Sequence, residues 1–305
     1  MTHISPQSMR LLFSNLILRN VTKVVYKFCY PSTYKHNRKF WPYYKVERNH
    51  EGGVSKIYFK NKLVVDNSPP DLSALKKCML IATGPSIQNL SEDIFSRPDI
   101  DYMGINGAIA LEKIIFKYYV IIDHNFTMNR FDLVLKVLNT DCTFYTTPRC
   151  LDLILRKVNF SAITCNIKII EPITRGEVER FLGPKVNIDT TKNYFFIDQD
   201  RGFSTHISDV VFDYFTVAYV ALQIIHALHY QEIYLAGLDM NNFSQPRFYE
   251  SAENKQPTLL DQHLTITLPA FDTAAKFLTG KEIQVYNLSP QSSVNSFEKL
   301  SSELL

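Results

Sequence analysis

The sequence predicts an α/β fold with a mostly parallel sheet and flanking helices. From about residue 76 onward, short apolar runs alternate with segments of helical character. The apolar runs are typical of buried parallel strands, and several end in polar or small residues. Open parallel sheets bind ligands at the carboxyl ends of their strands. We therefore expect a ligand site along that edge of the sheet.

The predicted strands follow one another along the chain with helices between them. They cover residues 78–82, 102–106, 118–123, 143–146, 167–170, 232–239 and 281–288. The helices include residues 216–229 and a stretch around residues 269–279. This alternation favours right-handed crossovers within one sheet, so the strand ends would converge on one rim.

The composition is that of a globular protein. The chain has 305 residues, of which 46% are hydrophobic and 21% are charged, and this excludes a disordered or fibrous class. The five cysteines form no CxxC pair, so neither a zinc site nor a disulfide framework is indicated. No run of 18 apolar residues predicts a spanning helix, and the amino terminus does not have the pattern of a secretory signal. We expect a cytoplasmic protein.

Positive charge is concentrated at the amino terminus. Residues 1–46 contain eight basic and no acidic side chains, whereas the remaining 25 basic and 30 acidic side chains leave the rest of the chain at −5. Apolar residues at helical spacing in residues 9–28 predict an amphipathic helix, which either lies on an anionic membrane surface or packs on the body or another subunit. No RNA- or DNA-binding motif accompanies it. Residues 1–50 are predicted to be this basic arm and, over residues 30–50, an irregular basic linker, and residues 51–305 a single domain.

The turn Thr83-Gly84-Pro85-Ser86 follows the first predicted strand and opens a helical segment. Gly84 would let the backbone approach a ligand, Ser86 could cap the helix, and free amides there would attract a phosphate. Since the turn is neither GxGxxG nor a Walker loop, it gives no direct support to a dinucleotide or a triphosphate. A simple strand-to-helix turn is the alternative interpretation.

Polar residues follow three further strands. Asn106 could hydrogen-bond a ribose, a sugar or a phosphate, or it could occupy a tight turn beside Gly107. Asp123 and Asp239 could bind a base, a ribose or a sugar hydroxyl, or cap a helix. Their joint position at strand ends is what makes them candidates for one site.

Asp198-Gln199-Asp200 has the DxD spacing by which many sugar transferases hold a divalent ion, although the string is common by chance. Four histidines, at positions 206, 226, 229 and 263, are candidates for a general base. His226 and His229 lie in a predicted helix and are better explained by packing or by the end of that helix. His263 follows a flexible polar stretch and is the better candidate.

Arg247-Phe248-Tyr249-Glu250 follows the strand that ends at Asp239. Arg247 could bind a carboxylate or a phosphate with two hydrogen bonds, and Tyr249 could stabilise a leaving phosphate. An ordinary surface loop with a buried aromatic side chain is the alternative interpretation.

Several strings occur together in the order of a known family. They are Gly84-Pro85, Ile105-Asn106-Gly107, Gly202-Phe203-Ser204, Phe215-Thr216-Val217-Ala218, Gly237-Leu238-Asp239, Arg247-Phe248-Tyr249-Glu250 and Tyr286-Asn287-Leu288-Ser289-Pro290. Through them, roughly residues 76–293 resemble the bacterial lipopolysaccharide-core enzymes called Kdo-III transferases (the WaaZ or RfaZ type). The layout also resembles, more distantly, the bacterial sialyltransferases that use CMP-sialic acid.

The resemblance implies one Rossmann-like, variant GT-A domain that binds a CMP-activated acidic sugar. It implies a glycosyltransferase that moves Kdo from CMP-Kdo onto the inner core of lipopolysaccharide with inversion, without a cofactor or a bound metal. A sialyltransferase that acts on lipooligosaccharide, and a non-catalytic glycan- or nucleotide-binding protein of polysaccharide assembly, are the alternatives. The basic arm would hold the protein on the inner face of the inner membrane of a Gram-negative bacterium, where a lipid-linked oligosaccharide acceptor resides.

The resemblance also implies roles for individual residues. Arg247 would meet an acidic group, Tyr249 the departing phosphate, with Phe248 as the other candidate for the aligned position, and His263 would deprotonate the acceptor hydroxyl. The residues that would hold the nucleotide sugar are Thr83, Gly84, Pro85, Ser86, Asn106, Asp123, Thr216 and Asp239.

Overall fold

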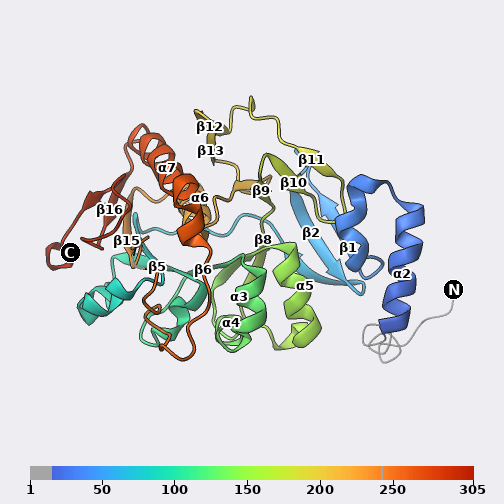
Figure 1. Cartoon of the computed structure of the whole chain (residues 1–305), viewed down its shortest axis with the longest axis horizontal. Coiled ribbons are helices and arrows are strands. Elements are labelled where there is room, and N and C mark those ends of the chain that lie inside the picture. Colours follow the sequence, from blue (N-terminus) through green and yellow to red (C-terminus); the bar gives the residue numbers. More distant parts are fainter. Residues whose placement is uncertain (1–15, 242) are drawn as a thin grey trace.

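A computed structural model of the chain, which describes residues 16–241 and 243–305, contains an eight-stranded parallel sheet with helices on both faces (Figure 1). The strand order is β17-β16-β15-β4-β5-β6-β7-β8, and every neighbouring pair is parallel. The strands are β4 (Lys77–Ile81), β5 (Ile100–Ile105), β6 (Tyr118–Ile121), β7 (Thr143–Thr146), β8 (Asn166–Ile169), β15 (Glu232–Ala236), β16 (Gln284–Asn287) and β17 (Glu298–Lys299). The predicted α/β class is confirmed.

The order of the strands reverses between β4 and β15. The chain adds β5 to β8 on one side of β4, and then returns to add β15, β16 and β17 on the other side. Successive crossovers on the two sides of such a point lie on opposite faces of the sheet, so the carboxyl ends of the two central strands flank a crevice. The fold therefore leaves a place for a ligand beside the ends of β4 and β15.

The sheet has a hydrophobic core on each face. Alternate residues of β4 point to opposite faces, and Cys78 to Ile81 are all 0% exposed. Cys78 and Leu80 pack in the core that contains α6 (Val217–Ala227) and α7 (Leu260–Thr279), whereas Met79 and Ile81 pack with α4 (Phe131–Leu138) and α5 (Pro148–Lys157). Figure 1 shows α6 and α7 on one side of the sheet and α3 (His124–Asn129), α4 and α5 on the other.

Two helical predictions differ from the structure. The helix predicted around residues 269–279 begins at Leu260, because Leu264 and Leu268 continue the stripe that packs on the core and Pro269 lies inside the helix. The segment after the Thr83–Ser86 turn contains no α-helix but two short 3-10 helices, η2 (Pro85–Asn89) and η3 (Glu92–Ser96). Three further 3-10 helices are η4 (Asn106–Ala110), η5 (Phe160–Ala162) and η6 (Ser302–Leu304).

The prediction of an irregular linker over residues 30–50 is wrong. This segment contains the 3-10 helix η1 (Ser32–Lys39) and the strand β1 (Tyr44–Arg48), which pairs with β2 (Val54–Phe59) and, through it, β3 (Lys62–Asp66). The buried Asn37 side chain donates to the Gly183 carbonyl at 2.6 Å and accepts from the Leu182 amide at 2.9 Å. Contacts with residues far along the sequence therefore order the segment. The domain boundary at residue 50 stays a prediction.

Two further small sheets were not predicted. They are the four-stranded β11-β10-β9-β14 and the two-stranded β12-β13. Their strands are β9 (Pro172–Thr174), β10 (Glu177–Glu179), β11 (Lys185–Asn187), β12 (Phe195–Asp198), β13 (Arg201–Ser204) and β14 (Val211–Phe212). Most are three or four residues long, too short for a periodic pattern to identify.

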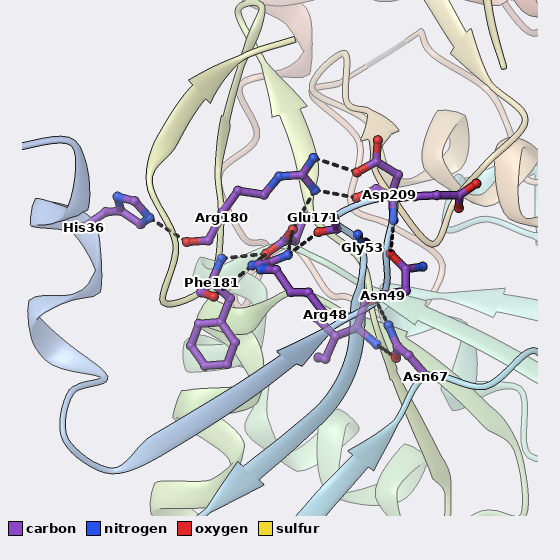
Figure 2. A network of polar contacts seen from close by, with 12 residues as sticks. His36, Arg48, Asn49, Gly53, Asn67, Glu171, Arg180, Phe181 and Asp209 are labelled. Carbon is purple, nitrogen blue, oxygen red and sulfur yellow. Dashed lines mark hydrogen bonds and ion pairs between the residues drawn. The ribbon is translucent and has the colours of Figure 1, made fainter. Parts of the chain in front are cut away.

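A buried network of charges joins the β1–β3 sheet to the β9–β11 sheet (Figure 2). Glu171 is 2% exposed and accepts from Arg48 at 2.8 and 3.0 Å, from Arg180 at 2.9 Å and from the Phe181 amide at 2.6 Å. Arg180 also donates to the Asp209 carboxylate at 2.6 Å. Buried charges are stable only when they are paired and fully hydrogen-bonded, and this network meets that condition.

The helix α2 (Leu16–Cys29) stands at one end of the molecule (Figure 1). Tyr26 is buried, and its ring centroid lies 5.8 Å from that of Trp41, which attaches one side of the helix to the body. On another side, four apolar side chains at helical spacing face solvent: Val21 (52% exposed), Val24 (55%), Val25 (43%) and Phe28 (84%). We call these four residues the α2 stripe. Residues 9–15 of the predicted helix lie outside the described residues. No helix in the described part of the chain is long and apolar enough to span a membrane.

Candidate functional site

A cavity of about 1040 Å³ lies at the carboxyl ends of β4, β5, β6 and β15. The candidate residues that line it, each from the end of a strand or the loop after it, are Thr83, Gly84, Pro85, Asn106, Asp123 and Asp239. Thr216, Arg247, Tyr249 and His263 line it as well, whereas Ser86 does not. All of these candidates from the sequence except Ser86 therefore line one cavity.

Hydrogen bonds join the loop after β4 to the loop after β15. The Ser86 amide donates to Asp239 Oδ2 at 3.0 Å, and the Ser86 hydroxyl donates to Asp239 Oδ1. The Gly84 amide donates to the Gly237 carbonyl at 2.9 Å. The prediction of free amides is wrong at these two positions, because a carboxylate and a carbonyl of the same chain already accept from them.

Gly84 serves this contact between the two loops. A Cβ atom at position 84 would lie 2.3 Å from Asp239 Oδ2 and 2.6 Å from the Gly237 carbonyl oxygen, so only glycine fits. The backbone at Gly84 approaches Asp239 closely, and its predicted approach to a ligand stays a prediction. Ser86 caps no helix, since it lies inside η2, whose N-cap is Gly84.

Asn106 ends β5 in a left-handed conformation with φ of 47°, which asparagine tolerates. Its side-chain oxygen is buried and, among the described residues, has no hydrogen-bond partner. The next residue, Gly107, lies against the ring of Tyr249, where a Cβ atom would come within 2.1 Å of the ring. The Asn106-Gly107 segment therefore also contacts the ring of Tyr249.

Tyr249 lies in a restricted, largely buried position on the cavity wall. Its ring is 5.2 Å from the Arg130 guanidinium carbon, and burial raises the pKa of its hydroxyl to about 12. The hydroxyl therefore stays protonated at neutral pH and is able to donate a hydrogen bond.

Asp123 caps α3, because its carboxylate accepts from the Asn125 amide at 2.7 Å. The capping alternative is confirmed, and the same side chain borders the cavity. Arg247 is paired within its own loop: it donates to Glu250 at 2.8 Å, and the Glu250 side chain is 0% exposed. Arg247 is thus a half-buried, preoriented cation at the cavity wall.

His263, on α7, stacks face to face on Phe215, with ring centroids 3.7 Å apart and an angle of 10° between the planes. Phe215 and Met240 both border the cavity in the left-handed region, with φ of 63° and 50°. Thr216, the N-cap residue of α6, is buried, and its side chain makes no capping hydrogen bond. The loops after β14 and β15 thus meet the cavity in strained conformations.

Asp213 lines the same cavity and was not selected from the sequence. Its Oδ1 atom is buried and has no hydrogen-bond partner among the described residues. Burial raises the pKa of Asp213 to about 6. The sequence offers only a weak signal, a carboxylate between Phe212 and Tyr214 shortly before a helix.

Other candidates lie away from the cavity. Asp198 pairs with Lys276 at 2.7 Å and Asp200 pairs with Arg201, and neither borders the cavity, so the DxD interpretation is wrong for this site. His226 packs between Phe203 and Phe277, and burial lowers the pKa of its imidazole to about 4. These two rings confirm the packing interpretation of His226.

His206 pairs with Glu51 at 2.7 Å. His229 follows the end of α6 with φ of 64°. Neither histidine borders the cavity. Of the four histidines selected from the sequence, His263 is the one at the site.

Two known proteins resemble part of this chain in sequence. A protein of Salmonella typhimurium named "Probable 3-deoxy-manno-octulosonic acid transferase" is 32% identical over 94 residues, which are 31% of this chain and 34% of that protein. A protein of Escherichia coli with the same name is 35% identical over 82 residues, 26% of this chain and 27% of that protein. The matches therefore span about a third or less of each relative.

Among solved structures, the sialyltransferase CstII from Campylobacter jejuni in complex with CMP-3FNeuAc aligns with 74% of this chain and 86% of its own. The sequence identity is 15% and the TM-score is 0.33. The family model described as "3-deoxy-D-manno-octulosonic acid transferase WaaZ" matches residues 197–298. That segment carries Thr216, Asp239, Arg247, Tyr249 and His263, whereas the β4 and β5 loops lie outside the match. The resemblance to the WaaZ Kdo-III transferase family is therefore confirmed for residues 197–298 of this chain.

Proposed function

We propose that this chain is an inverting glycosyltransferase that moves Kdo from CMP-Kdo onto the inner core of lipopolysaccharide, within a Rossmann-like, variant GT-A domain. The observation that carries this proposal is the position, at the cavity, of the segment that resembles the WaaZ family. A cavity of about 1040 Å³ has room for a nucleotide sugar.

The charges at the site suggest how CMP-Kdo would lie. Asp239 is a carboxylate beside the Thr83–Ser86 loop, so it would repel a phosphate and accept hydrogen bonds from hydroxyl groups of the ribose or the sugar. The phosphate would lie toward Tyr249, whose protonated hydroxyl can donate to it, and Arg247 would meet an acidic group. Thr83, Asn106, Asp123 and Thr216 would contribute further polar contacts to the donor.

The reaction joins an acceptor hydroxyl to the anomeric carbon of the sugar. The hydroxyl oxygen forms the new bond, the bond from that carbon to the phosphate oxygen breaks, and CMP leaves with the electron pair. Tyr249 would stabilise the negative charge on the leaving phosphate. The hydroxyl must also lose its proton, and His263 and Asp213 are two titratable groups of the cavity that can accept it.

Transfer of radiolabelled Kdo from CMP-Kdo to a Kdo-lipid A core acceptor tests the proposal directly. We expect labelled acceptor with the wild type and a loss of at least tenfold in turnover for Tyr249→Phe, because that variant cannot donate to the leaving phosphate. Activity in the presence of EDTA is expected. Absence of transfer, together with absence of CMP binding by calorimetry, would contradict the proposal.

Two alternatives give different outcomes in the same assay. A sialyltransferase would transfer label from CMP-sialic acid onto lipooligosaccharide and not from CMP-Kdo. A non-catalytic protein of polysaccharide assembly would bind CMP or glycan and transfer nothing to any acceptor.

The α2 stripe supports a membrane location for the amino-terminal arm. Exposed apolar side chains on a helix that also carries Lys23 and Lys27 are typical of a helix that lies in the interface of an anionic membrane. The protein would then be peripheral on the cytoplasmic face of the inner membrane, beside its lipid-linked acceptor.

Sedimentation with vesicles of phosphatidylethanolamine and phosphatidylglycerol tests this location. Phe28 is 84% exposed, and burying its ring in the interface contributes about 1.5–3 kcal/mol, so Phe28→Ser should weaken binding roughly tenfold or more. Ile115→Ser is the matched control, because Ile115 is equally apolar, 89% exposed and distant from α2 in the sequence. Equal binding by both variants would contradict the membrane role of the stripe.

A further inference from the structure

The cavity contains a carboxylate, that of Asp213, which forms no ion pair within the part of the chain that the structure describes. Asp213 lies between β14 and α6, and one of its oxygens, Oδ1, is buried without a partner among residues 16–241 and 243–305. A buried acceptor that lacks a hydrogen bond costs free energy, so the site is completed when a ligand brings a donor to this oxygen. A sugar hydroxyl is such a donor, whereas an ionised phosphate is not.

The backbone around Asp213 is held in place from two sides. The Asp213 amide donates to the Ile173 carbonyl on β9 at 3.3 Å, and the Thr267 hydroxyl on α7 donates to the Tyr214 carbonyl at 2.9 Å. The left-handed turn at Phe215 then redirects the chain into α6. A catalytic group needs this kind of fixed support, because small displacements weaken its effect.

The surroundings of Asp213 bring its pKa close to neutral pH. Burial and, to a smaller extent, the nearby carboxylate of Asp123 raise its pKa to about 6, although the backbone amides of Phe215 and Thr216 act to lower it. Among the described residues, no Lys, Arg or His forms an ion pair with it. The other titratable groups that border the cavity come from several elements. They are His36 on η1, Asp123 and His124 at the start of α3, Arg149 on α5, Arg175 after β9, Glu177 and Glu179 on β10, Lys185 on β11, Asp239, Arg247, Tyr249, Glu250 and Lys255 after β15, and His263 on α7. A group that is ionised at neutral pH, yet more basic than an ordinary carboxylate, is suited to accept a proton.

His263 has a different environment. Its ring stacks on Phe215 at 3.7 Å, so one face of the imidazole is covered by an aromatic surface. The two rings border the cavity and form a flat surface of the kind against which sugar rings pack. The histidine is therefore placed to position an acceptor sugar.

We propose that Asp213 is a catalytic residue that accepts the proton of the attacking acceptor hydroxyl, and that His263 and Phe215 form the wall that positions the acceptor. This inference rests on the proposed transferase function. The hydroxyl oxygen bonds to the anomeric carbon, the electron pair of the broken bond leaves with CMP, and the hydroxyl proton passes to Asp213 Oδ1. Asp213 then releases that proton to water.

The test compares Asp213→Asn with His263→Gln in the transfer assay across pH 5 to 9. For Asp213→Asn we expect kcat to fall roughly 10²- to 10⁴-fold, the usual contribution of a general base, while the dissociation constant for CMP stays within about threefold of the wild type. The acid limb of the wild-type profile near pH 6 should be absent from this variant. For His263→Gln we expect a higher KM for the acceptor, a smaller loss of kcat and an unchanged acid limb.

The outcomes separate this inference from the proposed function. Retention of at least a third of the wild-type kcat by Asp213→Asn, or loss of the acid limb in His263→Gln instead, would overturn the role of Asp213 and leave the transferase function intact. A wild type that transfers neither Kdo nor sialic acid overturns the proposed function and this inference together. Calorimetric CMP binding and thermal unfolding show whether each variant is folded, so a misfolded protein cannot imitate the expected loss.

Discussion

Replacing Asp213 by asparagine is expected to stabilise the folded chain at high pH. The pKa of Asp213 rises from an ordinary 3.8 to about 6 on folding, because burial disfavours the charged form. A carboxyl group with a raised pKa contributes its full stability below pH 3.8, and that stability is lost as pH rises through the folded pKa. Asparagine has the same shape and no charge to bury.

The size of the effect follows from the two pKa values. With 1.36 kcal/mol for each unit of pKa, the charged carboxylate costs the folded state about 3 kcal/mol at pH 8 and about 1 kcal/mol at pH 4.5. Asp213→Asn should therefore gain roughly 2 kcal/mol more stability at pH 8 than at pH 4.5. The charge of Asp213, the proposed catalytic residue, would thus destabilise the folded state.

Urea unfolding followed by circular dichroism at the two pH values measures this difference. Asp71→Asn is the control, because Asp71 is exposed and the substitution removes the same charge from the surface. A stabilisation of equal size at both pH values would show that the gain is not electrostatic. Destabilisation at pH 8 would refute the reasoning, since it would mean that the charged carboxylate has a stabilising partner.

Three further predictions concern the contacts that hold the site together. Glu171→Gln should lower the free energy of unfolding by about 3 kcal/mol, because it removes the buried charge that compensates two partly buried arginines, whereas the exposed Glu112→Gln should cause no resolvable change in a urea titration. Gly84→Ala should separate the β4 and β15 loops and weaken CMP binding measured by calorimetry; unchanged affinity would contradict the contact with Asp239. Gly107→Ala should displace the Tyr249 ring and reduce transfer at least as much as Tyr249→Phe, while full activity would show that the ring position is unimportant.

The sequence was sufficient for the parallel sheet because each strand has its own local signal. Apolar runs such as Cys78–Ile81 are buried on both faces, and polar residues mark where they end. Because parallel strands bring their carboxyl ends to one edge, the candidates after β4, β5, β6 and β15 could be grouped without knowing any contact. The same logic did not extend to strands of three residues, whose pattern is too short to recognise.

The chemistry of individual residues was less predictable. Ser86 looked like a phosphate-binding helix cap, but its partner Asp239 lies 153 residues further along the chain. Asp198 and Asp200 matched a metal-binding string, yet the hairpin that carries them lies away from the cavity. Asp213 gave almost no signal, because its unusual pKa comes entirely from what surrounds it. Local sequence indicates which side chains are present, whereas long-range packing decides what each can do.

The left-handed residues Phe215 and Met240 have a consequence for how this protein can change over generations. Each bulky side chain holds a backbone conformation that glycine would adopt without strain, at a cost on the order of 1–3 kcal/mol per residue. Both positions border the cavity, but Met240 is also buried in the core, where loss of its side chain would cost about 2–5 kcal/mol in packing and outweigh the relief of strain. Phe215 is 37% exposed, so it is the position of the two at which selection for stability and selection for the shape of the cavity oppose each other.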